Sequence, residues 1–303
     1  MPGHGMNGRR NKIKQGGGMK KILIGLIVVL GIFMGCAVEK HTYHGSSYYN
    51  PNWFLDGKVV YLENYDRYRI ERYFPFGDKE ITLEDSWYVC EMNGDGSGKK
   101  RIVRLPFEWN LGGSHPCVSA TNDKIVLGNG SDGIWVLNRD GSGLKKIVED
   151  GCYPDFNPEG TKVVYEKPKE GIWIYDLTTG KDSCIISDTL AMMPAWSPDG
   201  GKIAYVRGET VLGLIYIQQT FQNSFEVPHR IRGLDWMPDS KQIKVTYAWI
   251  NIETGEVIED ERSAYKIAFD GRYGIYSGGA NICRYSIETG ETVVILETYT
   301  EEE

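Results

Sequence analysis

The stretch Pro194-Ala-Trp-Ser-Pro-Asp-Gly-Gly-Lys-Ile-Ala-Tyr205 reads as two short strands joined by a tight turn. Within Ser197–Gly200, proline presets φ at the first corner, and aspartate and glycine tolerate the left-handed backbone that follows. Beyond the turn, Ile203 and Tyr205 alternate with small or polar residues, which is the pattern of a strand with one buried face. The stretch therefore predicts a β-hairpin.

This hairpin recurs along the chain. Copies begin 40 residues earlier, at Pro154, and 40 residues later, at Leu234. Weaker copies begin at Pro51, where the turn is one residue shorter, at Pro116, and at Ile267, where the proline is missing. The period of about 40 residues indicates six structural repeats.

A second hairpin follows each first one. These second hairpins begin at Trp87, Ile134, Ile172, Leu214, Trp249 and Ile282. Two hairpins per period give four strands, and a four-stranded repeat of roughly 40–45 residues is the signature of a propeller blade. The sequence therefore predicts an all-β fold, a six-bladed β-propeller of four-stranded antiparallel blades over residues 51–303. Ile243–Asn251 leaves almost no room for a turn, which favours a truncated fifth blade.

The Trp-Ser-Pro-Asp-Gly turn resembles the WD40-like repeat of TolB-type propellers, and the resemblance runs from Pro51 to about Leu296. It implies the propeller fold and says little about function. The separate N-terminal α/β domain of that family has no counterpart in this sequence, so the role of TolB itself is not implied. The aromatic residues at repeat positions are predicted to pack between blades: Trp53, Phe156, Trp196, Trp236, Tyr61, Tyr165 and Tyr205.

The N-terminal region has the parts of a secretory signal peptide. Met19-Lys-Lys is a basic start, Ile22–Met34 is apolar, and Gly35-Cys36 follows. Phe33-Met-Gly-Cys36 resembles the lipobox of bacterial lipoproteins, although leucine is more common where Phe33 stands. We therefore expect a signal peptide over residues 19–35, lipidation of Cys36, and an extracytoplasmic protein anchored to a membrane in the periplasm or outer cell envelope. The alternative is an uncleaved anchor, but Ile22–Val38 is at the short limit for spanning a bilayer.

The segments on either side of this signal are polar. Residues 1–18 are rich in glycine, and we interpret them as an upstream mis-start without a fold. Residues 36–50 are predicted to be a tether, and the acidic tail Thr298–Glu303 is expected to fray.

Composition limits the kinds of partner. The whole chain has a net charge of −7, and residues 1–35 carry six basic groups and no acidic one, which leaves −13 for the rest. So acidic a body argues against nucleic acid as a partner, because phosphate contacts require clustered lysine and arginine.

No cofactor, metal or catalytic residue is predicted. Asn93–Gly98 looks like the start of a calcium loop, but Arg104 stands where the EF-hand requires glutamate. There is no Gly-x-Ser-x-Gly motif. Five cysteines follow Cys36, with no Cys-x-x-Cys, and we interpret them as small buried hydrophobes, with a Cys117–Cys152 pair left open.

Binding is expected in irregular parts of the chain. Glu63–Ser86 is inserted between the second and third strands of blade one, and its aromatic and arginine residues do not follow the repeat. Residues of this kind are enriched at binding hot spots, and loops on a rigid scaffold often carry function. The insertion and the loops between blades belong to the same predicted face, whose candidate partner-binding residues are Tyr65, Arg67, Tyr68, Arg72, Tyr73, Trp109, His115, His229, Arg230 and Arg232.

The sequence thus predicts a lipid-anchored cell-envelope propeller that acts as a binding platform for a protein or a glycan. An added hairpin that packs its own aromatics on blade one explains the insertion equally well. The alternative function is a polysaccharide lyase or glycoside hydrolase that uses the axial pocket, with His115 and His229 facing each other across its mouth.

Overall fold

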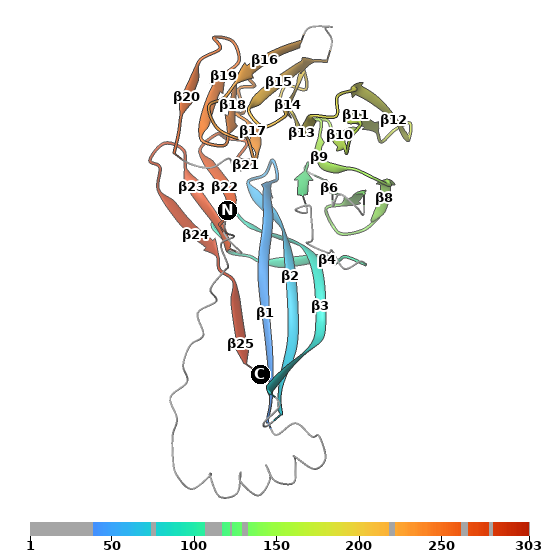
Figure 1. The fold of residues 1–303 in the computed structure, drawn as a ribbon, viewed down its shortest axis with the longest axis vertical. Coiled ribbons are helices and arrows are strands. Elements are labelled where there is room, and N and C mark those ends of the chain that lie inside the picture. Colours follow the sequence, from blue (N-terminus) through green and yellow to red (C-terminus); the bar gives the residue numbers. More distant parts are fainter. Residues whose placement is uncertain are drawn as a thin grey trace, which may run out of the picture. The chain divides into compact units, whose positions relative to one another are not determined.

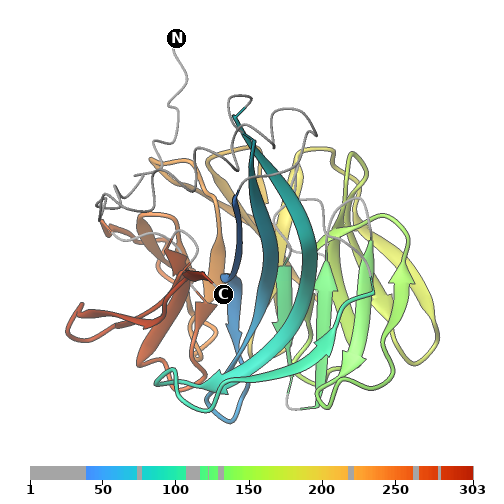
Figure 2. The ribbon, with the colours of Figure 1, turned by 90° about the horizontal axis from the view of Figure 1, so that it is seen from below.

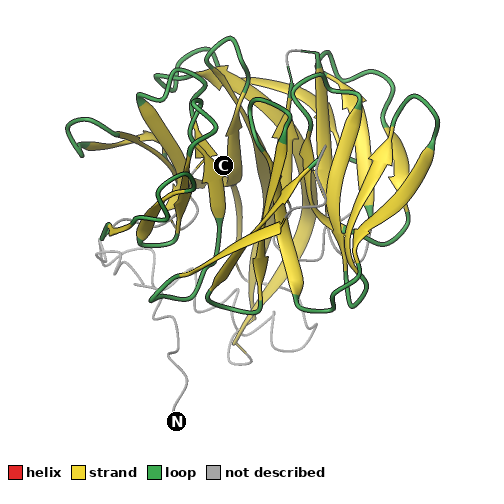
Figure 3. Ribbon diagram, turned by 90° about the horizontal axis from the view of Figure 1, so that it is seen from above, coloured by secondary structure: helices red, strands yellow, loops and turns green. Residues whose placement is uncertain are grey.

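A computed structural model describes residues 39–73, 77–106, 117–121, 123–128, 133–217, 222–261, 266–278 and 281–302. Figure 3 shows that these residues form strands and loops without a helix. Accordingly, no described segment is a helix long and apolar enough to cross a membrane. Residues 1–18, the predicted signal peptide and Cys36 lie outside the described residues.

The strands form six sheets, one for each predicted blade, and the fold is a six-bladed β-propeller (Figure 1). Blade one contains β1 (Glu39–Trp53), β2 (Lys58–Tyr73), β3 (Gly77–Asn93) and β4 (Lys100–Arg104). Blade two contains β5 (Cys117–Ala120), β6 (Lys124–Gly128), β7 (Ile134–Asn138) and β8 (Lys145–Val148). Blade three contains β9 (Cys152–Phe156), β10 (Lys162–Lys167), β11 (Gly171–Asp176) and β12 (Lys181–Ile186).

The remaining blades have the same plan. Blade four contains β13 (Ala191–Trp196), β14 (Lys202–Arg207), β15 (Val211–Tyr216) and β16 (Gln222–Glu226). Blade five contains β17 (Leu234–Trp236), β18 (Gln242–Val245), β19 (Ala248–Asn251) and β20 (Val257–Glu259). Blade six contains β21 (Lys266–Ile267), β22 (Tyr273–Gly278), β23 (Asn281–Ser286) and β24 (Thr292–Leu296). A further strand, β25 (Tyr299–Glu302), joins the sheet of blade one beside β1.

The chain forms two compact units. The larger comprises His44–Arg67 and Glu84–Glu301 and carries the blades, which Figure 2 shows side by side. The first strands of the blades surround one axis (Figure 1). The smaller unit comprises the described residues among 1–43, 68–83 and 302–303.

The predicted hairpin turn has the expected hydrogen bonds. The Ser197 amide donates to the Lys202 carbonyl and the Gly200 amide to the Ser197 carbonyl, both at 2.9 Å. Gly200 has a φ of +71°, which glycine adopts without steric cost. The Asp199 carboxylate accepts the Gly201 amide at 2.9 Å, so the turn residues also satisfy the backbone locally.

Packing between blades forms the core. Each of five apolar clusters combines residues from two successive blades, including the pair formed by blades six and one. The prediction for the repeat aromatics is confirmed, because each is at most 8% exposed: Trp53, Phe156, Trp196, Trp236, Tyr61, Tyr165 and Tyr205. Because both sides of a blade contribute to these clusters, an isolated blade would leave an apolar face in water.

The expectations for the tether, the acidic tail and blade five are corrected. Most of the predicted tether, from Glu39 onward, belongs to β1, and the acidic tail is β25 rather than a frayed end. In both cases a neighbouring strand satisfies the backbone of a polar segment. The insertion extends β2 and β3 as an added hairpin. Blade five has all four strands, since Val245 pairs directly with Ala248 and two residues suffice for the turn.

The C-terminal strand β25 helps to close the ring. It follows blade six in the chain and pairs with β1 of blade one. Gly45 allows the close approach, because a Cβ there would lie 2.5 Å from the Tyr299 carbonyl oxygen. Two further bonds link the same blades: the Trp53 indole donates to the Lys266 carbonyl at 3.0 Å, and the Asn50 amide donates to the Ser277 hydroxyl at 2.9 Å.

We expect Gly45→Val, and separately removal of residues 298–303, to lower the free energy of unfolding by about 1–3 kcal/mol in urea titrations. Both changes detach β25, so the double variant should lose no more stability than the truncation alone. Full additivity of the two losses would show that β25 does not depend on Gly45, and unchanged stability would show that β25 contributes nothing to closure.

Candidate functional site

One side chain from the first strand of each blade occupies the same place in the repeat, two residues before the start of the turn. These six residues are Asn52, Ser119, Asp155, Ala195, Asp235 and Lys266. All except Ala195 line cavities between the first strands, which surround the axis of the larger unit. The repeat therefore places two carboxylates and one ammonium group in the centre of the propeller.

Both carboxylates connect successive blades. Asp155 accepts hydrogen bonds from the Ser119 hydroxyl at 2.7 Å and from the Trp196 amide at 2.8 Å. Asp235 accepts the Ile267 amide at 2.6 Å and lies 3.4 Å from the Lys266 ammonium. Burial raises the pKa of Asp235, and the nearby Lys266 charge opposes this increase. These bonds give the two aspartates a structural role.

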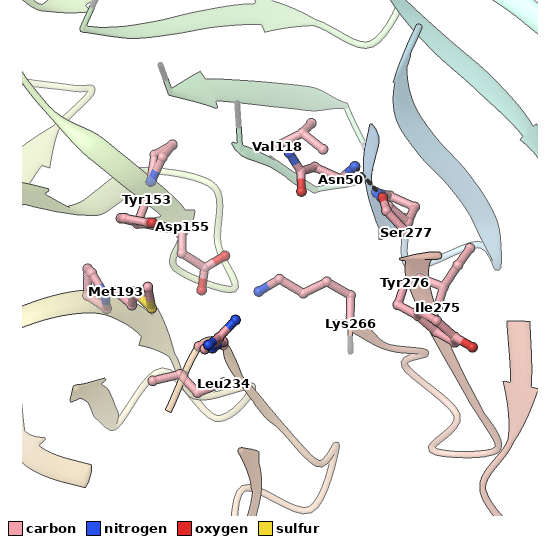
Figure 4. Close-up of a pocket in the computed structure, with 15 residues that line it drawn as sticks. Asn50, Val118, Tyr153, Asp155, Met193, Leu234, Lys266, Ile275, Tyr276 and Ser277 are labelled. Atoms are coloured by element: carbon pink, nitrogen blue, oxygen red, sulfur yellow. Dashed lines mark hydrogen bonds between the residues drawn. The ribbon is translucent and has the colours of Figure 1, made fainter. Parts of the chain in front are cut away.

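Two cavities lie on the axis. The loop-side cavity, about 300 Å³, is bounded by the starts of the first strands and includes Tyr153, Arg232 and Tyr276. The turn-side cavity, about 180 Å³, is lined mainly by apolar residues such as Trp236 and Phe269. Asp155 and Lys266 line both cavities. Figure 4 shows these two side chains pointing toward one another across the open centre.

The wall of the loop-side cavity contains three strained residues at equivalent places in the repeat. Asn50, Tyr153 and Met193 have φ values of +46°, +49° and +51°, a region that non-glycine residues rarely adopt. The Met193 amide donates to the Glu166 carboxylate at 3.1 Å. The Asn50 amide donates to the Ser277 hydroxyl at 2.9 Å. Such strain persists only where the surroundings fix the backbone, and it is concentrated at functional sites.

Burial raises the pKa of Glu166, although the Met193 amide opposes the shift. The folded protein therefore holds this proton more tightly than the unfolded chain, so the carboxyl contributes stability at low pH that is lost as pH rises through the folded pKa. Glutamine keeps an acceptor for the amide and does not titrate. We expect Glu166→Gln to gain stability relative to wild type between about pH 4 and pH 7 in urea unfolding. A difference independent of pH would contradict this.

A group of exposed aromatic and basic side chains lies in the loops of blades four and five. The Tyr247 ring is 5.9 Å from the His229 ring and is 43% exposed. Arg230 pairs with Glu209 at 3.2 Å, whereas Arg232 lines the loop-side cavity. We call His229, Arg230, Arg232 and Tyr247 the loop patch.

Tyr247 is absent from the sequence-based candidates. It has a φ of +61°, which is strained for an aromatic residue. The length of Ile243–Asn251 could have indicated it. So short a segment leaves only Thr246 and Tyr247 for the turn, and a tyrosine in a two-residue turn is a candidate for exposure.

Three candidates in the added hairpin, Tyr65, Tyr68 and Arg72, have a partner within their own unit. In the larger unit, the Arg101 guanidinium lies 5.0 Å from the centre of the Tyr65 ring, and Arg67 is half-buried. In the smaller unit, Tyr68 stacks on Tyr43 at 5.4 Å, and Arg72 pairs with Glu39 and Asp78 at 2.9 and 3.1 Å. Of the remaining candidates, the side chain of Tyr73 and all of Trp109 and His115 lie outside the described residues.

The calcium-like segments form tight turns. Asp95 accepts the amide and hydroxyl of Ser97 at 2.9 and 2.7 Å, and Asp140 accepts the same groups of Ser142. Within the described residues, no three His, Cys, Asp or Glu side chains are grouped to hold a metal ion.

The cysteine predictions need one correction. Cys90, Cys152 and Cys283 are buried and form no disulfide, whereas Cys184 is exposed on the outer strand of blade three. Its position is fixed by register, opposite Trp173. The side chain of Cys117 lies outside the described residues.

No family model and no curated protein sequence matches this chain. A chain in the solved structure "Crystal Structure of Mitotic Checkpoint Complex" is similar with a TM-score of 0.52 and 12% identity, over 79% of this chain and 89% of that one. Another, from "Oligogalacturonate lyase in complex with manganese", has a TM-score of 0.44 and 15% identity, over 68% of this chain and 62% of that one. The first likeness supports the fold alone, and the second is too distant to support an inference.

Proposed function

We propose that this protein is a lipid-anchored binding platform of the cell envelope, related to the TolB-type propellers, and that it holds a protein or glycan partner at the loop patch. The observation that carries this proposal is the exposed Tyr247 ring beside His229, held in strained backbone. A strained turn that exposes an aromatic ring is costly for folding and favourable for binding.

The position of the loop patch also supports binding. Arg232 belongs both to the patch and to the lining of the loop-side cavity, so a partner that covers the patch can also reach into the cavity. The surrounding blades form a rigid scaffold, which limits the conformational entropy lost on binding.

Binding is better supported than catalysis. The carboxylates in the centre, Asp155 and Asp235, accept backbone amides of neighbouring blades at 2.8 and 2.6 Å. A general acid or base must exchange protons with a substrate, and groups that fasten blades together are poorly placed for that task. We therefore propose no catalytic residue.

The patch is tested by replacing His229 with Ala and Tyr247 with Asn, which tolerates positive φ. The double variant should retain an envelope partner about tenfold less well than wild type, measured by crosslinking in membranes and mass spectrometry of the captured material. Phe269→Ala is the matched control, because this aromatic residue is 61% exposed beside the turn-side cavity.

A site at the loop patch would be contradicted if the double variant and Phe269→Ala lost capture equally. It would also be contradicted if the double variant captured the partner as well as wild type. Turnover of a polysaccharide by the purified protein, abolished by His115→Ala or His229→Ala, would instead establish the enzyme.

The proposed anchor rests on the order of basic, apolar and Gly35-Cys36 segments in the sequence. Expressed in a bacterium, the full chain should fractionate with membranes, and mass spectrometry should find acyl chains on Cys36 at a new N-terminus. Cys36→Ser should carry no acyl chain. An unprocessed N-terminus in the wild-type protein would refute the lipoprotein assignment.

A further inference from the structure

The Arg232 guanidinium is a cation at the wall of the loop-side cavity. The Arg232 backbone amide donates to the Thr246 hydroxyl at 2.8 Å, which fixes the residue at the cavity wall. Its guanidinium forms no hydrogen bond or ion pair with any residue that the structure describes. Other arginines of blade four and of the connection to blade five form ion pairs. Arg207 pairs with Asp188, and Arg230 pairs with Glu209. Arg232 is therefore available to a ligand.

A second cation reaches the same space. Lys266 lines the cavity, and its side chain is 32% exposed. The Lys266 ammonium lies 3.4 Å from Asp235, so its charge is already shared with that carboxylate. Figure 4 shows the Lys266 side chain extending into the open centre of the cavity.

Among the described residues that line the cavity, Asp155 is the one carboxylate, and it is already hydrogen-bonded. Asp155 accepts one hydrogen bond on each oxygen, from Ser119 and Trp196, and both donors belong to neighbouring blades. Lys266 lies beside Asp235, so among the described charges at the cavity wall it is the Arg232 guanidinium that has no counter-charge. The Ser277 hydroxyl accepts the Asn50 amide and retains its own proton for donation.

We infer that the loop-side cavity binds a carboxylate of the partner, held by the Arg232 guanidinium with Lys266 nearby. A guanidinium matches a carboxylate through two parallel hydrogen bonds, which is the strongest pairing open to an unpartnered arginine. The cavity volume, about 300 Å³, is at the lower end for ligand pockets, so it admits one residue or one sugar ring rather than a polymer. The carboxylate belongs to a peptide or to an acidic sugar. This inference depends on the proposed function for placing the partner at the loop side.

The test uses the full chain and four small probes in calorimetric and NMR titrations. N-acetyl-alanyl-alanine is compared with its C-terminal amide, and methyl glucuronoside with its methyl ester. We expect saturable binding of at least one free acid and none of its neutral counterpart, and the acid that binds identifies a peptide or a sugar as the source.

Arg232→Gln should weaken that binding by about tenfold or more, and Arg232→Lys should restore part of it, because lysine keeps the charge without the bidentate geometry. Arg272→Gln is the matched control: this arginine is 74% exposed, pairs with Asp270 and lies away from the loop-side cavity. The Arg272→Gln variant should bind the acid with the same affinity as wild type.

The inference is wrong if neither acid binds saturably, if the amide or ester binds as well as its acid, or if Arg232→Gln leaves the affinity unchanged. These outcomes are separable from failure of the platform. Partner capture that depends on His229 and Tyr247, without binding of the acids, keeps the platform and removes the carboxylate site. Binding of an acid without any captured partner keeps the carboxylate site and removes the platform.

Discussion

The propeller depends on hydrogen bonds in which a side chain on the first strand of one blade accepts a backbone amide from the first strand of the next. Asp155 does this for Trp196, and Asp235 for Ile267. Near the axis, polar side chains of the first strands connect successive blades. Farther out, apolar clusters shared by successive blades complete the contact. A buried amide left without a partner costs roughly 1–3 kcal/mol, which makes these acceptors difficult to replace.

The same constraint explains how the ring closes. Blades one and six are far apart in sequence, and their contact requires loop closure over the whole chain. The indole of Trp53, the amide of Asn50 and a shared apolar cluster connect them, and β25 adds backbone pairing with β1. The acidic composition of residues 298–303 gives no hint of this strand, because its stability comes from pairing and not from burial of its side chains.

The proposed binding site uses side chains that do not connect the blades. Most charged groups at the centre are committed to neighbouring blades, which argues against reading every axial carboxylate as a catalyst. Among the described residues on the loop side, Arg232 and the exposed Tyr247 ring are exceptions. Arg232 lies in the connection between blades four and five, and Tyr247 in the short turn of blade five. Blade five therefore combines the shortest connection between its second and third strands with the clearest candidate for binding. A short blade leaves fewer neighbours to cover its loop residues.

The sequence by itself determined the hairpins, their period and the number of blades. A turn such as Ser197–Gly200 is specified by its own residues, because proline and glycine restrict or release φ locally, and period-2 alternation selects the buried face. It also determined the aromatic core, since the tryptophans and tyrosines recur with the blades.

Only the tertiary structure decided the rest. The strained backbone at Asn50 and Met193 is one case, because a neighbouring blade supplies the acceptor for each amide, Ser277 for Asn50 and Glu166 for Met193. The ion pair of Arg72 with Glu39 and the pairing of β25 with β1 likewise depend on residues distant in sequence, and so does the lack of a described partner for the Arg232 guanidinium. Such contacts carry no local signature, because their free energy belongs to the pair of segments and not to either segment alone.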